Sequence, residues 1–95
     1  MNNYEVKFLP AARIDMKEIF RYIKEEDPTA AIHRIEILET EISKLSTFPL
    51  MGTQPKQRKL RTHQYRMLIV SNYIVFYIFE NEMVKMHRVI HAKRR

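Results

Sequence analysis

The apolar residues of the first half of the chain follow two different periods. Every second residue from Tyr4 to Phe8 is apolar and charged residues lie between them, which predicts a short strand that ends before Pro10. Farther along, the apolar positions recur every three or four residues, at Ala12, Met16, Ile19 and Ile23. At about 100° per residue these four positions fall within an arc of roughly 60°. The second segment is therefore predicted to be an amphipathic helix.

The pair Asp27-Pro28 predicts a very short joint between this helix and a second one. The residue before a proline disfavours helix, so the first helix should end near residue 26, while Asp27 can cap a new helix that has Pro28 at its first position. The second helix has its own apolar stripe, formed by Ala31, Ile35, Leu38, Ile42 and Leu45. Two helices joined in this way form a hairpin. Ile14 and Ile37 lie off the two stripes, which makes them candidates for contacts with the sheet or with a partner.

The second half of the chain reads as strands. The segment 48–52, FPLMG, ends the second helix, because Pro49 cannot continue it and the only glycine, Gly52, follows where a reversal is needed. After a polar connector over 53–58, stretches rich in Val, Ile, Tyr and Phe cover 60–70, 71–79 and 83–91, with turns at 71–72 and 81–82. They predict three or four antiparallel strands. The middle stretch is apolar on both faces and should be central.

The order β-α-α-β-β-β predicts an α+β fold in which an antiparallel sheet packs against a helical hairpin. With 95 residues, the chain has material for a single domain over residues 1–95. No cysteine is present, and no spacing of metal ligands or glycine-rich phosphate loop occurs, so we expect neither metal nor cofactor. No apolar run approaches the roughly 20 residues that span a bilayer, and the N-terminal sequence lacks the order of a signal peptide. We expect a cytoplasmic protein with no membrane partner.

Charge is distributed unevenly along the chain. Residues 1–46 hold seven Lys or Arg and nine Asp or Glu, a balance of −2, whereas residues 47–95 hold ten Lys or Arg and two Glu, a balance of +8. The two values sum to the net charge of +6. A positive surface of this kind attracts phosphate backbones, acidic protein segments or anionic lipid, so we expect a polyanionic partner.

Two clusters concentrate the positive charge. The first lies on the connector and the start of the next strand and contains Lys56, Arg58, Lys59, Arg61 and Arg66, with His63 and Tyr65 among them. On a regular strand, Lys59, Arg61, His63 and Tyr65 would share one face. Arginine forks bind phosphate and tyrosine stacks on bases, so we expect this cluster to bind a target or nucleic acid. The alternative is an edge strand that its cations protect from aggregation.

The second cluster ends the chain and contains Arg88, His91, Lys93, Arg94 and Arg95. Cleavage of RNA requires groups that move protons and stabilise a pentavalent phosphorane, and His91 with Arg61 or Arg66 has the necessary chemistry. The alternative, which we favour, is that His91 hydrogen-bonds within the fold and positions the C-terminal tail. We predict that Arg88, Lys93 and Arg94 belong with the first cluster to a target-binding surface.

Several segments, taken in order, resemble the RelE/ParE superfamily of bacterial type II toxins. The resemblance covers nearly the whole chain and rests on Asp15 with 19–23 (IFRYI), 48–52 (FPLMG), Leu60-Arg61, Tyr65-Arg66, 73–77 (YIVFY) and 88–91 (RVIH). It implies a sheet packed on a helical hairpin and a toxin silenced by a tightly bound cognate antitoxin encoded beside it. An acidic antitoxin segment would suit the basic half of the chain, and Ile14 and Ile37 are candidates for its binding surface.

The branches of this superfamily differ in chemistry, and the resemblance implies two alternatives. RelE-like members cut mRNA on the ribosome and use an arginine within a Tyr-Arg-Leu-Val-Tyr type strand, whereas ParE-like members poison DNA gyrase. If that strand corresponds to 73–77, Ile74 replaces the arginine; if it corresponds to 65–69, Arg66 keeps the role but the next hairpin becomes long. The first alignment has fewer gaps and favours a ParE-like toxin without a catalytic residue. A nuclease would use Arg61, Arg66 and His91, and a DNA-binding module without toxicity is a third reading.

Overall fold

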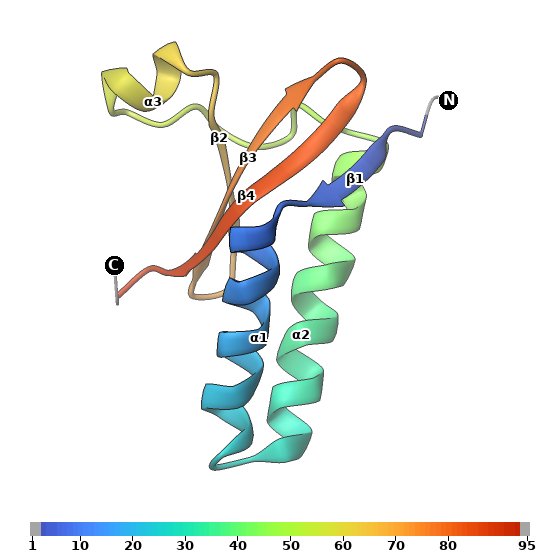
Figure 1. The fold of residues 1–95 in the computed structure, drawn as a ribbon, viewed down its shortest axis with the longest axis vertical. Helices are drawn as coiled ribbons and strands as arrows, with labels where there is room; N and C mark the ends of the chain where they lie inside the picture. The colour runs from blue at the N-terminus through green and yellow to red at the C-terminus, as the bar shows by residue number, and fades with distance from the viewer. Residues whose placement is uncertain (1–2, 94–95) are drawn as a thin grey trace.

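A computed structural model describes residues 3–93 and shows a four-stranded sheet with a helical hairpin on one face (Figure 1). The elements follow in the order β1 (Glu5–Phe8), α1 (Pro10–Lys24), α2 (Pro28–Ser43), the 3-10 turn η1 (Lys44–Ser46), α3 (Arg58–Thr62), β2 (Arg66–Val70), β3 (Tyr73–Glu80) and β4 (Met83–His91). This confirms the predicted α+β fold and its β-α-α-β-β-β order, to which the structure adds the short helices η1 and α3. In the part of the chain that the structure describes, no helix is long and apolar enough to cross a membrane.

The strands are arranged in the order β1-β4-β3-β2, so that β3 and β4 are interior and β1 and β2 form the edges. β2, β3 and β4 are antiparallel neighbours, as expected, whereas β1 pairs with β4 in parallel. The sheet is therefore mixed. Both tight turns lie where the sequence placed them, and Ser71, Asn81 and Glu82 adopt the positive φ angles that two-residue hairpin turns use.

The helical hairpin forms for the local reasons read from the sequence. Pro28 is the first residue of α2, and the Asp27 carboxylate caps the helix by accepting a hydrogen bond from the Ala30 N–H at 3.0 Å. Most residues of the two apolar stripes pack into a core that they share with β2, β3 and β4. The largest fully buried side chains of this core are Tyr77, Leu38, Ile42, Leu45, Met86, Val75 and Val84.

One predicted element is wrong, because the segment before β2 is not a strand. Residues Arg58–Thr62 form the one-and-a-half-turn helix α3, and Gln64 then takes a positive φ of 65° before β2 begins. Lys59, Arg61, His63 and Tyr65 therefore do not share a strand face. Arg, Lys and Leu favour helix and the segment has almost no β-branched residue, so the local preference is helical. The His63 ring nitrogen Nδ1 reinforces the turn, since it lies 2.8 Å from the Lys59 carbonyl oxygen.

A second departure from regular structure occurs in β4. In the pairing with β3, Phe76 lies opposite Arg88 and the next residue, Tyr77, lies opposite Met86. His87 therefore has no partner in the register and is the extra residue of a β-bulge. The bulge moves the buried positions of β4 from Val84 and Met86 to Val89. Simple alternation along this strand therefore does not decide which side chains face the helices.

Candidate functional site

The first cation cluster lies on the connector and on α3. Lys56, Arg58, Lys59 and Arg61 are exposed, and Tyr65 and Arg66 are half-buried where β2 begins. Arg61, Tyr65 and Arg66 come together around a hollow of about 210 Å³, whose other walls are Leu50, Gln54, Gln64 and Phe79. The structure thus joins three of the predicted target-binding residues in one place, whereas the exposed Lys56, Arg58 and Lys59 do not line this hollow.

Arg66 is held by the connection between the second helix and β2. Its Nη1 donates to the Gly52 carbonyl oxygen at 2.9 Å and to that of Leu50 at 3.4 Å. The buried Tyr77 also binds this connection. Its hydroxyl accepts a hydrogen bond from the Gly52 N–H at 2.9 Å and donates one to the Pro49 carbonyl oxygen at 2.8 Å. Burial raises the pKa of the Tyr77 phenol, so that it remains a neutral O–H donor.

The reason for glycine at position 52 differs from the expected one. The φ of Gly52 is not positive, and so no glycine-specific turn requires it. Instead, a Cβ at this position would lie 2.6 Å from the Tyr77 hydroxyl oxygen and 2.8 Å from the Met67 carbonyl oxygen. Gly52 is therefore needed for the close approach of the connection to the sheet.

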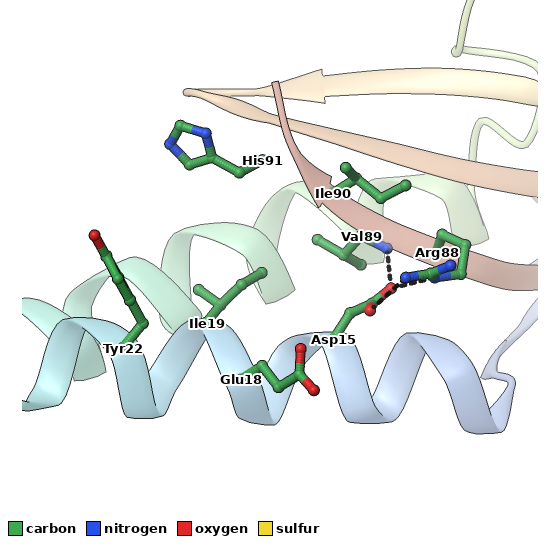
Figure 2. A pocket seen from close by; sticks show the side chains of 8 residues that line it. All are labelled: Asp15, Glu18, Ile19, Tyr22, Arg88, Val89, Ile90 and His91. Atoms are coloured by element: carbon green, nitrogen blue, oxygen red, sulfur yellow. Dashed lines mark hydrogen bonds and ion pairs between the residues drawn. The ribbon is translucent and has the colours of Figure 1, made fainter. Parts of the chain in front are cut away.

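Arg88 is paired inside the fold with a residue from the first helix (Figure 2). Its Nε donates to Oδ2 of Asp15 at 2.7 Å and its Nη2 donates to Oδ1 at 3.0 Å. The Val89 N–H also donates to Oδ2, at 2.8 Å. Asp15 is 7% exposed, whereas about half of the Arg88 side chain faces solvent. The pKa of Arg88 is raised, chiefly by the hydrogen bond with Asp15 and to a smaller extent by the negative charge of Asp15.

The position of Asp15 follows from the length of β1. The last pair between β1 and β4 joins Phe8 to Met86. Beyond Met86, the side of β4 that faces away from β3 therefore has no strand beside it. Asp15 takes the place of a strand there, because its carboxylate accepts the Val89 N–H that would otherwise be left without a partner. Sequence reasoning did not assign this role. The available signal was a carboxylate at the margin of the apolar stripe of α1.

His91 lies at the end of β4 in a separate hollow of about 190 Å³, together with Asp15, Glu18 and Tyr22 from α1 (Figure 2). Its Nδ1 accepts a hydrogen bond from the Lys93 backbone N–H at 3.1 Å. The ring of Tyr73 meets the His91 ring edge-on at 5.1 Å. The hydrogen bond lies within the fold, which is one part of the role that the sequence favoured for His91. Lys93 is exposed beside it, and Arg94 lies outside the described residues.

The three candidate nuclease residues do not converge. Arg66 pairs with Tyr77 of β3, whereas His91 pairs with Tyr73, and the two partners are about 13 Å apart along the strand. β2 and β4 also lie on opposite sides of β3. Arg61 and Arg66 therefore line one hollow and His91 lines another. A proton-transfer group and a phosphorane-stabilising group need to contact the same phosphate, whereas Arg66 and His91 line separate hollows in this structure.

A further pair, which the sequence did not reveal, joins Tyr65 to His87 of the bulge. The Tyr65 hydroxyl lies 3.1 Å from Nδ1 of His87, and the two rings meet edge-on at 5.0 Å. Burial lowers the pKa of His87, which favours its neutral form. Within residues 3–93, no three His, Cys, Asp or Glu side chains gather in a group that would hold a metal ion.

The two candidate antitoxin-binding residues differ in exposure. Ile14 is 56% exposed on α1, whereas Ile37 is half-buried on α2 and packs against the core. A groove of about 650 Å³ lies between β1 and the two helices. Its apolar lining consists of Val6, Phe8, Met16, Phe20 and Ile35. Neither Ile14 nor Ile37 lines this groove, which sequence analysis did not identify.

Known proteins resemble this chain in fold and in sequence pattern. Among solved structures, a chain of the chromosomal ParDE toxin-antitoxin system of P. aeruginosa matches with a TM-score of 0.78 and 12% identity, covering 93% of this chain and 95% of that chain. A chain of the RelBE2 toxin-antitoxin complex of Mycobacterium tuberculosis matches with a TM-score of 0.68 and 24% identity, covering 96% and 93%. At these identities the likeness shows the fold.

A search of curated proteins gave no significant match. The model of the ParE toxin of the type II toxin-antitoxin system parDE matches residues 6–95, nearly the whole chain. The chain therefore belongs to the ParE toxin family of type II toxin-antitoxin systems.

Proposed function

We propose that this protein is a ParE-like toxin that inhibits growth by acting on DNA gyrase and that a cognate antitoxin neutralises it. The observation that carries the proposal is the family match over residues 6–95. The alternative, a RelE-like endoribonuclease that cuts mRNA on the ribosome, would need Arg61, Arg66 and His91 around one phosphate. Their distribution over two hollows supports the reading without a nuclease centre.

The groove between β1 and the helical hairpin is the surface that best suits the antitoxin. Its apolar lining fits the face of an amphipathic segment, and β1 is an edge strand to which an extended segment can add. Lys7, Arg13 and Lys17 line the groove against Glu5 and Glu39, a balance that suits an acidic segment. Ile14 is exposed on the same helix as Arg13 and Lys17 but does not line the groove, so it is a separate candidate contact for the antitoxin.

Induction of the toxin in cells, with and without the antitoxin encoded beside it, tests the proposal. We expect growth arrest that the antitoxin relieves, loss of supercoiling by purified gyrase, and no discrete cuts in translated mRNA by primer extension. His91→Ala should remain at least partly toxic, whereas Arg61→Glu and Arg66→Glu should weaken toxicity by changing the basic surface. Normal growth of cells that hold well-expressed, folded protein would refute a toxin. Cuts in the ribosomal A site that His91→Ala or Arg66→Ala abolishes would identify a nuclease instead.

A further inference from the structure

Three large apolar side chains are exposed together on the connection between η1 and α3. Phe48 is 57% exposed, Leu50 59% and Met51 40%. With Tyr4 and Phe79 they line a hollow of about 580 Å³. Single exposed apolar residues are common on protein surfaces, but a group of them marks a place where a partner binds.

The backbone that carries these side chains is fixed. Tyr77 holds Pro49 and Gly52 from the core, and Arg66 holds the carbonyl oxygens of Leu50 and Gly52. Thr53 is tied to Met67 of β2 by two backbone hydrogen bonds of 2.8 Å. The apolar side chains therefore cannot turn into the core, and a partner that binds them loses little free energy in ordering the connection.

This apolar hollow is continuous with the arginine hollow described above. Leu50 and Phe79 line both of them, on one side with Phe48 and Met51 and on the other with Arg61 and Arg66. Within the described residues, no carboxylate lines either hollow and neither arginine has an ion pair. An uncompensated positive charge next to an exposed apolar surface is complementary to a carboxylate next to apolar side chains.

We propose that the two hollows form one docking surface, 48–51 with Phe79, Arg61 and Arg66, for a segment of the toxin's target protein that presents apolar side chains beside carboxylates. This rests on the proposed function, because it assigns the contact with the target. The apolar half favours protein over nucleic acid, whose interfaces are polar and positively charged on the protein side. The surface shares no lining residue with the groove assigned to the antitoxin.

The test uses variants that change exposed side chains and so leave the fold intact. Phe48→Ser and Leu50→Ser remove the apolar contact, Arg61→Glu reverses the charge, and Arg61→Lys keeps it. Ile32→Ser is the matched control, since Ile32 is 54% exposed on α2 and lines neither hollow. Thermal unfolding of each purified variant should match that of the wild type.

Two readouts apply to all variants: growth arrest on induction at matched expression, and inhibition of supercoiling by purified gyrase. Truncation of a central contact residue weakens binding by about tenfold or more. We therefore expect Leu50→Ser, Phe48→Ser and Arg61→Glu to need about tenfold more toxin for half-inhibition, while Ile32→Ser and Arg61→Lys stay near the wild type. Binding of the antitoxin should be unchanged in Phe48→Ser, Leu50→Ser, Arg61→Lys and Ile32→Ser, whereas Arg61→Glu should slow only its association, because the variant removes positive charge that steers an acidic partner.

The outcomes separate failure of this inference from failure of the proposed function. A wild type that neither arrests growth nor inhibits gyrase contradicts the function itself. A wild type that arrests growth without inhibiting gyrase contradicts gyrase as the target, and growth arrest then decides the docking surface. If Leu50→Ser and Phe48→Ser arrest growth as strongly as the wild type, the docking surface is wrong, and loss confined to Arg61→Glu would indicate a phosphate backbone instead. If Leu50→Ser loses the antitoxin as well, the surface belongs to the antitoxin interface and the inference is overturned.

Discussion

At the scale of single residues, Asp15 shows how one carboxylate substitutes for a missing stretch of strand. It is buried on α1, accepts the Val89 N–H at the uncovered edge of β4 and is neutralised by Arg88. A buried carboxylate is tolerated only when its oxygens are paired, and here both are. Arg88 is half exposed, but its Nε and Nη2 atoms bind Asp15. Only the solvent-facing part of its side chain is therefore available to a target.

We predict that Asp15→Ala lowers the free energy of unfolding by about 3 kcal/mol, since it removes charge-assisted hydrogen bonds and leaves the buried Val89 N–H without an acceptor. Glu18→Ala, an exposed position on the same helix, should change it by less than about 0.5 kcal/mol. Urea unfolding of the purified variants measures both values. Equal stability of the two variants would show that the Asp15 contacts contribute nothing net.

At the scale of elements, the connection between η1 and α3 is a rigid part of the structure although it is neither helix nor strand. The hydroxyl of Tyr77 on β3 hydrogen-bonds to the connection. Gly52 has no Cβ, and this allows the connection to approach the Tyr77 ring closely. The connection in turn fixes Arg66 at the start of β2. An interior strand thereby determines the position of a surface loop and of the half-buried charge of Arg66.

We predict that Gly52→Ala destabilises the protein by about 1–3 kcal/mol, because the added Cβ has no space beside Tyr77. Tyr77→Phe should cost a similar amount, about 1–3 kcal/mol, because the buried Gly52 N–H loses its acceptor. Thr53→Ala is the control, since the Thr53 side chain is exposed and its backbone bonds remain. Thermal unfolding compares the three, and an unchanged midpoint for Gly52→Ala would contradict the steric explanation.

At the scale of the whole molecule, the uneven charge becomes a division of surfaces. The basic half of the sequence forms α3, β2, β3, β4 and their connections, whereas the nearly balanced half forms β1 and the helical hairpin with its apolar groove. The basic half steers a partner with acidic segments toward the protein, and the apolar groove can bury apolar side chains of that partner. This division suits an antitoxin that associates quickly and then dissociates slowly.

We predict that an increase in salt from low concentration to 0.5 M slows association with the antitoxin by about tenfold or more, because steering of charged partners is screened. The dissociation rate should change much less, since apolar burial in the groove does not depend on salt. Stopped-flow mixing measures the association rate, and surface plasmon resonance measures the dissociation rate. A variant with Lys56 and Lys59 changed to Gln should show a weaker dependence on salt, and an association rate independent of salt would refute the steering.

The sequence by itself determined the features that depend on neighbouring residues. The spacing of apolar residues is a local property, and it indicated the order of the main strands and helices. The Asp27-Pro28 pair marked the joint, polar pairs marked both hairpin turns, and the cations are read directly from the sequence. The helix at Arg58–Thr62 follows a local preference of Arg, Lys and Leu that the predicted strand overlooked. Only the tertiary structure decided the parallel pairing of β1 with β4, the bulge at His87, the Asp15 contacts with β4 and the separation of His91 from Arg66. Most of these depend on contacts between segments that are distant in sequence, and the spacing of side chains along one segment carries no information about which distant segment it will meet.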